Sequence, residues 1–443
     1  MAQQGASLIG RLSYGSPTMT GLLDELRWRG FIHQLTDEQQ IERHLQEGNR
    51  RVYAGFDPTG DSLTVGNLVP IMMLAHFQRA GHTPVVLMGG GTGLIGDPSG
   101  KSAERQLLSH EQVQANVHSI QRIFANVLSF EGPNAAALVD NHDWLSTLST
   151  LTMLRDIGKH FTVNMMIQKE SVRERLHNRE QGISYTEFSY MILQAYDYQH
   201  LAEQMNVTVQ LGGSDQWGNI VAGIDLTRRL HRREVFGITS PLLTRADGGK
   251  FGKTEKDAVW LSGHRTSAYA FYQFWMNTTD ADVPRFIRLF TFLEREAIDT
   301  VLEEHAADPA QRKAQRALAR EATRIIHGHA GLQRAEAATE ALFSGHVENL
   351  DLSTLNDAFA EAPSSQHDRS MLALDGLSLV ELLPLTSLCK SKREAREFLG
   401  NGSISVNGKK ASSETHLGVR DLLHDEVALL RRGRKAWHVT RWR

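Results

Sequence analysis

Residues 53–70 read YAGFDPTGDSLTVGNLVP, and this stretch decides how the chain folds. It begins as an apolar strand around Ala54 and Phe56, turns within residues 58–61 and continues as an apolar helical pattern as far as Phe77. An anion is favoured where such a strand meets a helix, because the first backbone N–H groups of the helix are unpaired and its dipole is positive there. The stretch therefore predicts a phosphate site at the end of a buried strand.

Strand-like and helical patterns alternate from residue 51 to residue 229. The expected strands are RVYAGF, PVVLMG, AALVDN and VTVQLGG, with helices running to Ala80 and over residues 103–128. Such alternation predicts an α/β fold, a doubly wound parallel sheet of Rossmann-like type with helices on both faces. Ligands of such sheets bind at the carboxyl ends of the strands.

The composition limits the function classes. The chain has 443 residues, of which 41% are apolar and 22% charged, with a net charge of -3, so it can build cores but has no overall nucleic-acid signature. The single Cys389 excludes a disulfide framework and a cysteine zinc site, which fits a reducing compartment. No apolar run approaches the roughly 20 residues of a membrane span, so we expect a cytoplasmic protein without membrane contact.

The chain is expected to divide into several segments. They are an N-terminal extension without order (1–18), the Rossmann-like domain (19–247), a mobile loop with an α-helical domain (248–349), a linker (350–371) and a small α+β domain (372–443). For the first segment, a weak organellar targeting peptide is the alternative, since it has Arg11 and no acid, and Met19 is an alternative start.

A second glycine-rich segment, MGGGTGLIGDPSGK, follows the strand PVVLM. Its Asp97 precedes two cations, Lys101 and Arg105, near a helix start. An acid beside two cations can meet an ammonium group and a polyphosphate together. A tight turn without a ligand is the alternative, because glycine strings alone are weak evidence.

A third segment places unusual polar groups on one helix face. In SYTEFSYMILQAYDY, Tyr190, Gln194 and Asp197 stand at positions i, i+4 and i+7, which share a face of a helix. Buried polar groups need partners, and a polar ligand would supply them. The alternatives are a solvated face or a network that satisfies itself.

Two further segments complete the set. In LGGSDQWGN, Gly213 allows close backbone approach, and Asp215 and Gln216 follow a strand end, where a carboxylate can hold ribose hydroxyls. In KFGKT, Lys250 and Lys253 form a movable positive clamp suited to a leaving pyrophosphate. Taken singly, these segments also fit a polar turn and an ordinary lysine-rich surface loop.

Together these segments resemble the class I aminoacyl-tRNA synthetases, and specifically the bacterial-type tyrosyl-tRNA synthetase family. YAGFDPTxDSLxxGxLxP, GTGLIGDPSGK, FSYxxLQAYD, GGSDQWGN and KFGKT stand in the family's order, and the resemblance runs from about Gly21 to the C-terminus. It implies activation of L-tyrosine by ATP to tyrosyl-adenylate, then transfer to the 3' end of tRNA(Tyr). It also implies a homodimer and Mg²⁺ carried by the ATP phosphates, with no protein metal site.

The resemblance implies three sets of site residues. Tyrosine would be bound by Tyr53, Asp97, Tyr190, Gln194, Asp197 and Gln216. ATP and the adenylate would be bound by Gly55, Asp57, Gly66, Gly213, Asp215 and Lys253. Catalytic roles toward the phosphates would fall to Thr59, Thr64, Asn67, Lys101, Arg105, Lys250 and Lys253. No general base is required, because the attacking tyrosine carboxylate is already ionised at pH 7.

The chain departs from the family at its signature, where two histidines are expected. Thr64 and Asn67 stand in their places. Asn67 keeps a hydrogen-bond donor, whereas Thr64 reaches less far and carries no positive charge. We therefore expect slower activation of tyrosine, with tyrosine affinity nearly unchanged.

The C-terminal segment resembles an S4-type RNA-binding module. Its cations are expected to contact tRNA phosphates, and they are Lys390, Lys392, Arg393, Arg396, Arg431 and Arg432. Trp437 and Trp442 are candidates for stacking on unpaired bases. A solvated charged face is the alternative.

Two other functions remain open at this point. A tryptophanyl-tRNA synthetase would share the fold and chemistry, but the phenol-binding pair Tyr53 and Asp197 argues against it. A non-catalytic RNA-binding relative would explain the missing histidines, but the retained Asp97, Asp215 and Lys253 argue against decay of the site.

Overall fold

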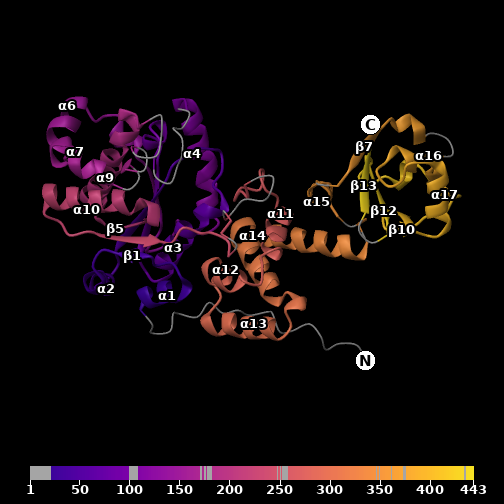
Figure 1. The fold of residues 1–443 in the computed structure, drawn as a ribbon, viewed down its shortest axis with the longest axis horizontal. Helices are drawn as coiled ribbons and strands as arrows, with labels where there is room; N and C mark the ends of the chain where they lie inside the picture. Colours follow the sequence, from indigo (N-terminus) through magenta and orange to yellow (C-terminus); the bar gives the residue numbers. More distant parts are fainter. Residues whose placement is uncertain are drawn as a thin grey trace. The chain divides into compact units, whose positions relative to one another are not determined.

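The computed structural model describes most of the chain. The described residues are 21–98, 108–169, 172–173, 176, 182–246, 248–249, 251, 258–345, 347–348, 350–360, 362–372, 376–433 and 436–443. They form two units (Figure 1). The first contains the chain up to Leu261 together with Thr279–Ala306, and the second contains Ser262–Thr278 together with Ala307–Arg443.

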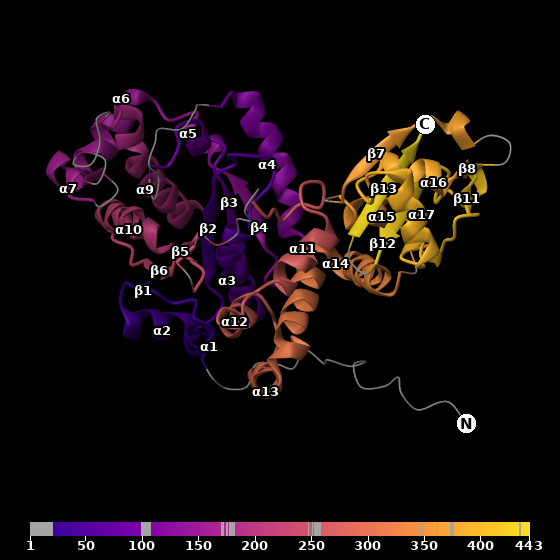
Figure 2. The same ribbon diagram turned by 45° about the vertical axis from the view of Figure 1, so that its right-hand side comes forward.

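The first unit is built on a six-stranded sheet with the order β1-β6-β5-β2-β3-β4. Its strands are β1 (Gln34–Leu35), β2 (Arg51–Phe56), β3 (Thr83–Met88), β4 (Ala137–Asp140), β5 (Val207–Gly213) and β6 (Phe236–Ser240). β2 to β6 pair in parallel, and β1 pairs antiparallel with β6. The chain builds outward from β2 to β4, as Figure 2 shows, and then returns to the other side of β2 with β5 and β6. The predicted doubly wound fold is confirmed.

Helices lie on both faces of this sheet. The helices of the first unit are α1 (Leu22–Arg29), α2 (Glu38–Gln46), α3 (Leu68–Arg79), α4 (His110–Phe124), α5 (His142–Leu145), α6 (Thr150–Thr152), α7 (Val163–Ile167), α9 (Tyr185–Met205), α10 (Trp217–His231), α12 (Val283–Leu289) and α13 (Arg295–Ala307). The ring of Tyr53 lies 5.2 Å from that of Tyr198 on α9, and the ring of Phe56 lies 4.9 Å from that of Phe124 on α4. Residues three apart on a strand point to opposite faces, so α9 and α4 lie on opposite sides of β2.

Short helices join several of these elements. The 3₁₀ turns are η1 (Val65–Asn67), η2 (Thr92–Leu94), η4 (Gly158–His160) and η5 (Ser214–Gln216), and η3 (Met153–Ile157) is a π-helical turn. η1, η2 and η5 each stand at the carboxyl end of the sheet, after β2, β3 and β5. They are the turns that the glycine-rich segments form.

One buried arginine connects α1 with residues 288–293 inside the first unit. Arg29, at the end of α1, is 4% exposed. Its guanidinium donates to the carbonyl oxygens of Arg288 and Thr291 at 2.9 Å each and of Leu293 at 2.6 Å, and to Glu25 Oε1 at 2.6 Å. Three carbonyls at the end of α12 thus share one donor group, which fixes how that segment lies on α1.

The second unit joins a helical part to a small sheet domain. Its helical part contains α11 (Ala268–Met276), the turn η6 (Pro309–Gln311), α14 (Lys313–Ser344) and α15 (Leu352–Ala358). α14 is kinked at Gly328, whose φ is 71° and ψ 178°. α11, η6 and α14 lie within residues 248–349, the segment expected to hold an α-helical domain.

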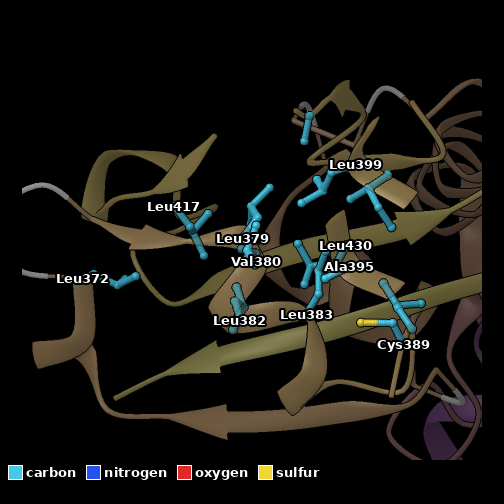
Figure 3. Close-up of a cluster of buried hydrophobic side chains, with 14 of the residues drawn as sticks. Leu372, Leu379, Val380, Leu382, Leu383, Cys389, Ala395, Leu399, Leu417 and Leu430 are labelled. Atoms are coloured by element: carbon cyan, nitrogen blue, oxygen red, sulfur yellow. The ribbon is translucent and has the colours of Figure 1, made fainter. Parts of the chain in front are cut away.

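The C-terminal domain contains two sheets around one apolar core. A five-stranded sheet has the order β10-β9-β12-β13-β7, and a two-stranded sheet pairs β11 with β8. The strands are β7 (Ser364–His367), β8 (Leu377–Ser378), β9 (Ile404–Val406), β10 (Lys409–Lys410), β11 (His416–Leu417), β12 (Val427–Arg432) and β13 (Ala436–Trp442). The helices are η7 (Arg369–Leu372), α16 (Leu379–Leu382), η8 (Leu383–Leu385), α17 (Lys392–Gly400) and η9 (Val419–Asp421). In Figure 3 Leu379, Leu399 and Leu430 gather in the core between α16, α17 and β12.

The segment 350–371, expected to be a linker, contains regular structure instead. It holds α15 and β7, and β7 pairs in parallel with β13. Leu355 and Phe359 pack in one cluster with Val427, Leu429 and Val439 of the C-terminal sheet. The sequence SSQH of β7 has no apolar residue, so it carries no strand signal. Its pairing with a strand more than 70 residues away creates the strand.

Two features concern the cellular compartment expected from the sequence. Within the described ranges, no helix combines the length and apolar character that crossing a bilayer requires. Cys389 is buried and is a free thiol.

The role of Arg29 can be tested by truncation. Arg29→Ala should lower the free energy of unfolding by about 3 kcal/mol, because three buried carbonyls lose a charged donor. Urea denaturation measures the change. Arg27→Ala is the matched control, since its ion pairs with Asp24 and Glu38 lie at the surface and should contribute about 1 kcal/mol at most. An equal loss in both variants would contradict the role given to Arg29.

Candidate active site

The predicted site residues converge at the carboxyl ends of β2, β3 and β5. Asp57 follows β2, residues 89–92 follow β3, and residues 213–216 follow β5. Close approach of these loops requires glycine. A Cβ atom at Gly89 would lie 2.2 Å from Asp57 Oδ1, and one at Gly90 would lie 2.2 Å from Asp140 Oδ1. The glycines let two carboxylates stand against the backbone of the β3 loop.

One end of the site is a buried phenol beside a buried carboxylate. Tyr53 is 1% exposed, and its hydroxyl oxygen has no hydrogen-bond partner among the described residues. Asp197, also 1% exposed, accepts hydrogen bonds from Asn141 Nδ2 at 2.9 Å and Trp144 Nε1 at 2.7 Å. Burial raises the pKa of Asp197 to about 7, against the two donors, which lower it. A ligand hydroxyl would give the Tyr53 phenol the partner that it lacks.

A hydrogen-bonded chain leads from this end toward the middle of the site. Asn141 Nδ2 also donates to Thr92 Oγ1 at 2.9 Å, and Thr92 Oγ1 donates to Asp57 Oδ1 at 3.0 Å. Tyr190 OH donates to Asp57 Oδ2 at 3.2 Å. Burial, and then the charge of Asp57, raises the pKa of Tyr190 well above its ordinary value, so Tyr190 remains a donor. The chain orients Asp57 from two sides.

The other polar side chains of α9 and η5 meet at the opposite end. Gln216 Nε2 donates to Asp97 Oδ2 at 2.7 Å, and Gln194 Nε2 donates to Gln216 Oε1 at 3.3 Å. Burial, and then the charge of Asp97, raises the pKa of Asp215. The polar face predicted on α9 thus lies within the first unit, bonded to residues of three other segments, rather than in solvent.

Several residues that are expected to bind ATP are exposed at the strand ends. Gly55 is exposed although β2 is a central strand, and Thr59 and Gly66 are exposed as well. A Cβ atom at Gly213 would lie 2.6 Å from Asp215 Oδ1. A central strand open to solvent at its carboxyl end is where a ligand of this fold binds.

The altered signature forms a local turn. Thr64 N and Thr64 Oγ1 both donate to Asn67 Oδ1 at 3.0 Å, across η1. Val65 N donates to Val259 O at 3.0 Å, which holds the turn against the segment after KFGKT. The carboxamide oxygen of Asn67 is therefore committed to Thr64.

Four predicted cations lie outside the described residues: Lys101, Arg105, Lys250 and Lys253. Phe251, between the two lysines of KFGKT, is described and packs on α12. Its ring lies 4.7 Å from that of Phe286 and is stacked at 5.6 Å on that of Phe290. Ala246 N donates to Asp282 Oδ1 at 2.8 Å just before the motif. These contacts tie the motif's surroundings to the helix that Arg29 holds.

The predicted RNA-binding cations fall into two groups. Lys390, Lys392, Arg393 and Arg396 are exposed on or beside α17. Arg431 and Arg432 instead lie over the rings of Trp437 at 4.8 Å and Phe398 at 4.9 Å. The interpretation of Trp442 as a stacking residue is wrong, because it is 1% exposed and belongs to the domain core.

Sequence reasoning missed several residues that orient the site: Thr92, Asn141, Trp144 and Asn219. Thr92 lies in GTGLIGDPSGK and Asn219 in GGSDQWGN, so their place in these two motifs is the signal that could have found them. Asn141 and Trp144 follow β4 in a segment with no motif of its own. Their contribution arises from where β4 ends in the sheet.

Comparison with known proteins decides the family. Residues 45–344 match the family model described as tRNA synthetases class I (W and Y), and residues 354–440 match the tyrosine–tRNA ligase SYY-like C-terminal domain. The tyrosine–tRNA ligase of Rhodopirellula baltica is 49% identical over 95% of this chain and 96% of its own length. The chain belongs to the tyrosine–tRNA ligase family.

Two more relatives extend the comparison. The tyrosine–tRNA ligase of Roseiflexus castenholzii is 48% identical over 96% of this chain and all of its own length. The crystal structure of a C-terminally truncated Aspergillus nidulans mitochondrial tyrosyl-tRNA synthetase has a TM-score of 0.67 and 30% identity, covering 73% of this chain and 94% of its own. The family is one of aminoacyl-tRNA synthetases, and its tyrosine branch is favoured over the tryptophan branch by both near-full-length relatives.

The raised pKa of Asp197 leads to a test of the phenol end. A ligand hydroxyl would be a third donor to Asp197 beside Asn141 and Trp144, and the ionised carboxylate is the stronger acceptor. Tyrosine affinity should therefore fall about tenfold as the pH drops from 8 to 6 through the pKa of about 7. Asp197→Asn should bind tyrosine weakly and lose this pH dependence. Equilibrium dialysis with labelled tyrosine measures both. The same pH dependence in Asp197→Asn would assign it to another group.

The altered signature leads to a second test. Thr64→His should raise the rate of tyrosine activation about tenfold or more, because an imidazolium adds a charged donor toward the leaving pyrophosphate. Tyrosine affinity should stay nearly unchanged, because the residues expected to bind tyrosine stand in other segments. Pre-steady-state activation kinetics separate the two quantities, with Thr64→Ala as control. Loss of tyrosine binding in Thr64→His would show that the position is misassigned.

Proposed function

We infer that this chain is a tyrosine–tRNA ligase that activates L-tyrosine with ATP to tyrosyl-adenylate and transfers the tyrosyl group to the 3' end of its tRNA. The observation that carries this inference is the buried Tyr53 phenol beside the Asp197 carboxylate, in a chain related to tyrosine–tRNA ligases over nearly its whole length. We propose that both groups hydrogen-bond the substrate phenol. Phenylalanine would leave the buried Tyr53 hydroxyl without a partner and give Asp197 no further donor, which costs free energy that tyrosine binding does not.

The first step requires positioning of two anions rather than a base. A tyrosine carboxylate oxygen attacks the α-phosphorus of ATP, the new P–O bond forms, and the bond to pyrophosphate breaks. The carboxylate is ionised at pH 7, so no proton has to be removed. The chain's residues then bind and orient the substrates and stabilise the negative charge on the leaving group.

We propose a role for each remaining group of the site. Asp97, Tyr190 and Gln194 hold the tyrosine ammonium group, and Gln216 lines the same pocket. The adenosine and the adenylate lie against Gly55, Asp57, Gly66, Gly213 and Asp215. The phosphates face Thr59, Thr64, Asn67, Lys101, Arg105, Lys250 and Lys253.

Mg²⁺ fits this site as an ion carried by the ATP phosphates. Asp57 and Asp97 each accept a hydrogen bond from a protein group at 3.2 Å or less, so these carboxylates are already engaged. Mg²⁺ bound to the phosphates would neutralise part of the negative charge of the leaving pyrophosphate.

Amino-acid-dependent exchange of labelled pyrophosphate into ATP tests the proposal. We expect exchange with tyrosine and none above background with tryptophan or phenylalanine. That result establishes activation and specificity together, and shows that Thr64 is tolerated. Absence of exchange, in a protein that still binds tRNA, would instead favour a non-catalytic relative.

We propose that the exposed basic residues of α17 bind tRNA phosphates. The double variant Arg393→Ala/Arg396→Ala should raise the KM for tRNA about tenfold, because each lost phosphate contact weakens binding. Pyrophosphate exchange should be unchanged. Glu397→Ala, an exposed residue on the same helix, is the control. Equal losses of aminoacylation and exchange would contradict this division of labour.

We also propose a homodimer, supported by exposed apolar residues on α6, η3, α7 and α9. Leu151 is 79% exposed, Leu154 52%, Val163 58%, Ile167 40% and Tyr185 70%. Three of these elements, η3, α7 and α9, also contribute Ile157, Met166 and Met191 to one buried cluster. Apolar surface gathered in this way is typical of an interface.

A reducing cytoplasmic location is our further proposal, which the free buried thiol of Cys389 supports.

The dimer proposal is tested by one added charge. Leu151→Lys should shift the protein from dimer toward monomer, because a lysine would be buried without a partner at the interface. Light scattering coupled to gel filtration measures the mass. Phe130→Lys is the control, since Phe130 is 38% exposed and lies outside this group. A dimeric Leu151→Lys variant would place the interface elsewhere.

A further inference from the structure

The amino end of the candidate site is ordered by carboxylates that only accept hydrogen bonds. Gln216 Nε2 donates to Asp97 Oδ2 at 2.7 Å and to Asp215 Oδ2 at 3.4 Å. An ionised carboxylate has no hydrogen to donate, so the amino group of the Gln216 amide must face the two acids. The amide oxygen of Gln216 must then point the opposite way, toward α9 and α10.

That oxygen determines how the next two amides lie. Gln216 Oε1 accepts from Gln194 Nε2 and from Asn219 Nδ2, each at 3.3 Å. Asn219 Nδ2 also donates to Gln194 Oε1 at 3.1 Å. The amino group of one asparagine therefore contacts the amide oxygens of both glutamines. Turning either glutamine amide around would set two amino groups against each other.

Asn219 is placed for this role by the fold. It stands in the first turn of α10 and is 6% exposed. A Cβ atom added at Gly212 would lie 3.1 Å from Gln216 Cβ, so the end of β5 approaches η5 closely and limits the space around Gln216. Because Asn219 is buried, its amide has little freedom to turn toward solvent.

We propose that Asn219 is a positioning residue for the substrate amino group. By donating to Gln194 Oε1, it keeps an acceptor on Gln194 rather than a donor. An ammonium group has only donors, so it binds an amide oxygen and is repelled by an amide NH₂. The inference rests on the proposed function, because it takes Asp97, Tyr190 and Gln194 as the ammonium site. It adds a residue that need not touch the substrate.

A ligand pair separates this role from a merely structural one. L-Tyrosine carries the amino group, and 3-(4-hydroxyphenyl)propanoate lacks it but keeps the phenol and carboxylate. Asn219→Ala should weaken tyrosine binding about tenfold, because a hydrogen-bond partner of the charged ammonium group is misplaced. It should change the affinity for the analogue less than twofold. Isothermal titration of the full-length protein measures both dissociation constants.

Two further variants sharpen the comparison. Asn219→Asp keeps the size of the side chain but replaces its donor by an acceptor, so it should show at least the same selective loss and serves if Asn219→Ala does not fold. Asn134→Ala is the matched control, because Asn134 Nδ2 also donates to two oxygens, Gln78 O at 2.7 Å and His82 O at 3.2 Å. It should change neither affinity.

The outcomes are distinct. Equal loss for both ligands in the Asn219 variants would overturn the inference, because the effect would be on the pocket as a whole. A wild-type preference for tyrosine that survives in both variants would overturn the inference alone. A wild-type protein with no preference for tyrosine over the analogue would overturn the assignment of the ammonium site, and this inference with it.

Discussion

Parallel pairing of β2 with both β3 and β5 is the constraint on which the site depends. β2 lies in the centre of the sheet, and Tyr53 pairs with Val85 on one side and Gln210 on the other. Parallel strands end at the same edge, so three loops distant in sequence meet there. The doubly wound order leaves this edge open beside β2, because the connections run outward on both sides.

Carboxylates at the ends of these loops and on α9 determine which side chains can lie around them. Asp57, Asp97 and Asp197 together accept hydrogen bonds from five side chains: Thr92, Tyr190, Gln216, Asn141 and Trp144. Their neighbours must therefore present O–H or N–H groups, as Tyr190, Gln216 and Trp144 do. Burial makes each misdirected dipole expensive, so the arrangement is specific. Among the described residues the Tyr53 hydroxyl has no hydrogen-bond partner, and the proposed tyrosine site would use it.

The second unit shows how weak local signals become structure through distant contacts. β7 consists of polar residues, yet β13 gives it backbone partners along four positions. Leu355 and Phe359 contribute apolar surface to the same cluster as Val427 and Val439. The basic residues of α17 remain exposed on the outside of this core. The segment that connects the helical part with the sheet domain is therefore folded.

The sequence by itself determined the alternation of strands and helices, the turn glycines and the polar face of α9, because these depend on period and on local backbone sterics. The family and the chemistry of the motif residues followed from the same signals. Only the tertiary structure decided that Asn141 and Trp144 bond Asp197, and that Asn219 bridges Gln194 and Gln216. Asn141 and Asp197 are 56 residues apart, and no periodic pattern relates positions at that separation. Their hydrogen bond, and the raised pKa that burial imposes on Asp197, exist only once the sheet has set β4 beside β3.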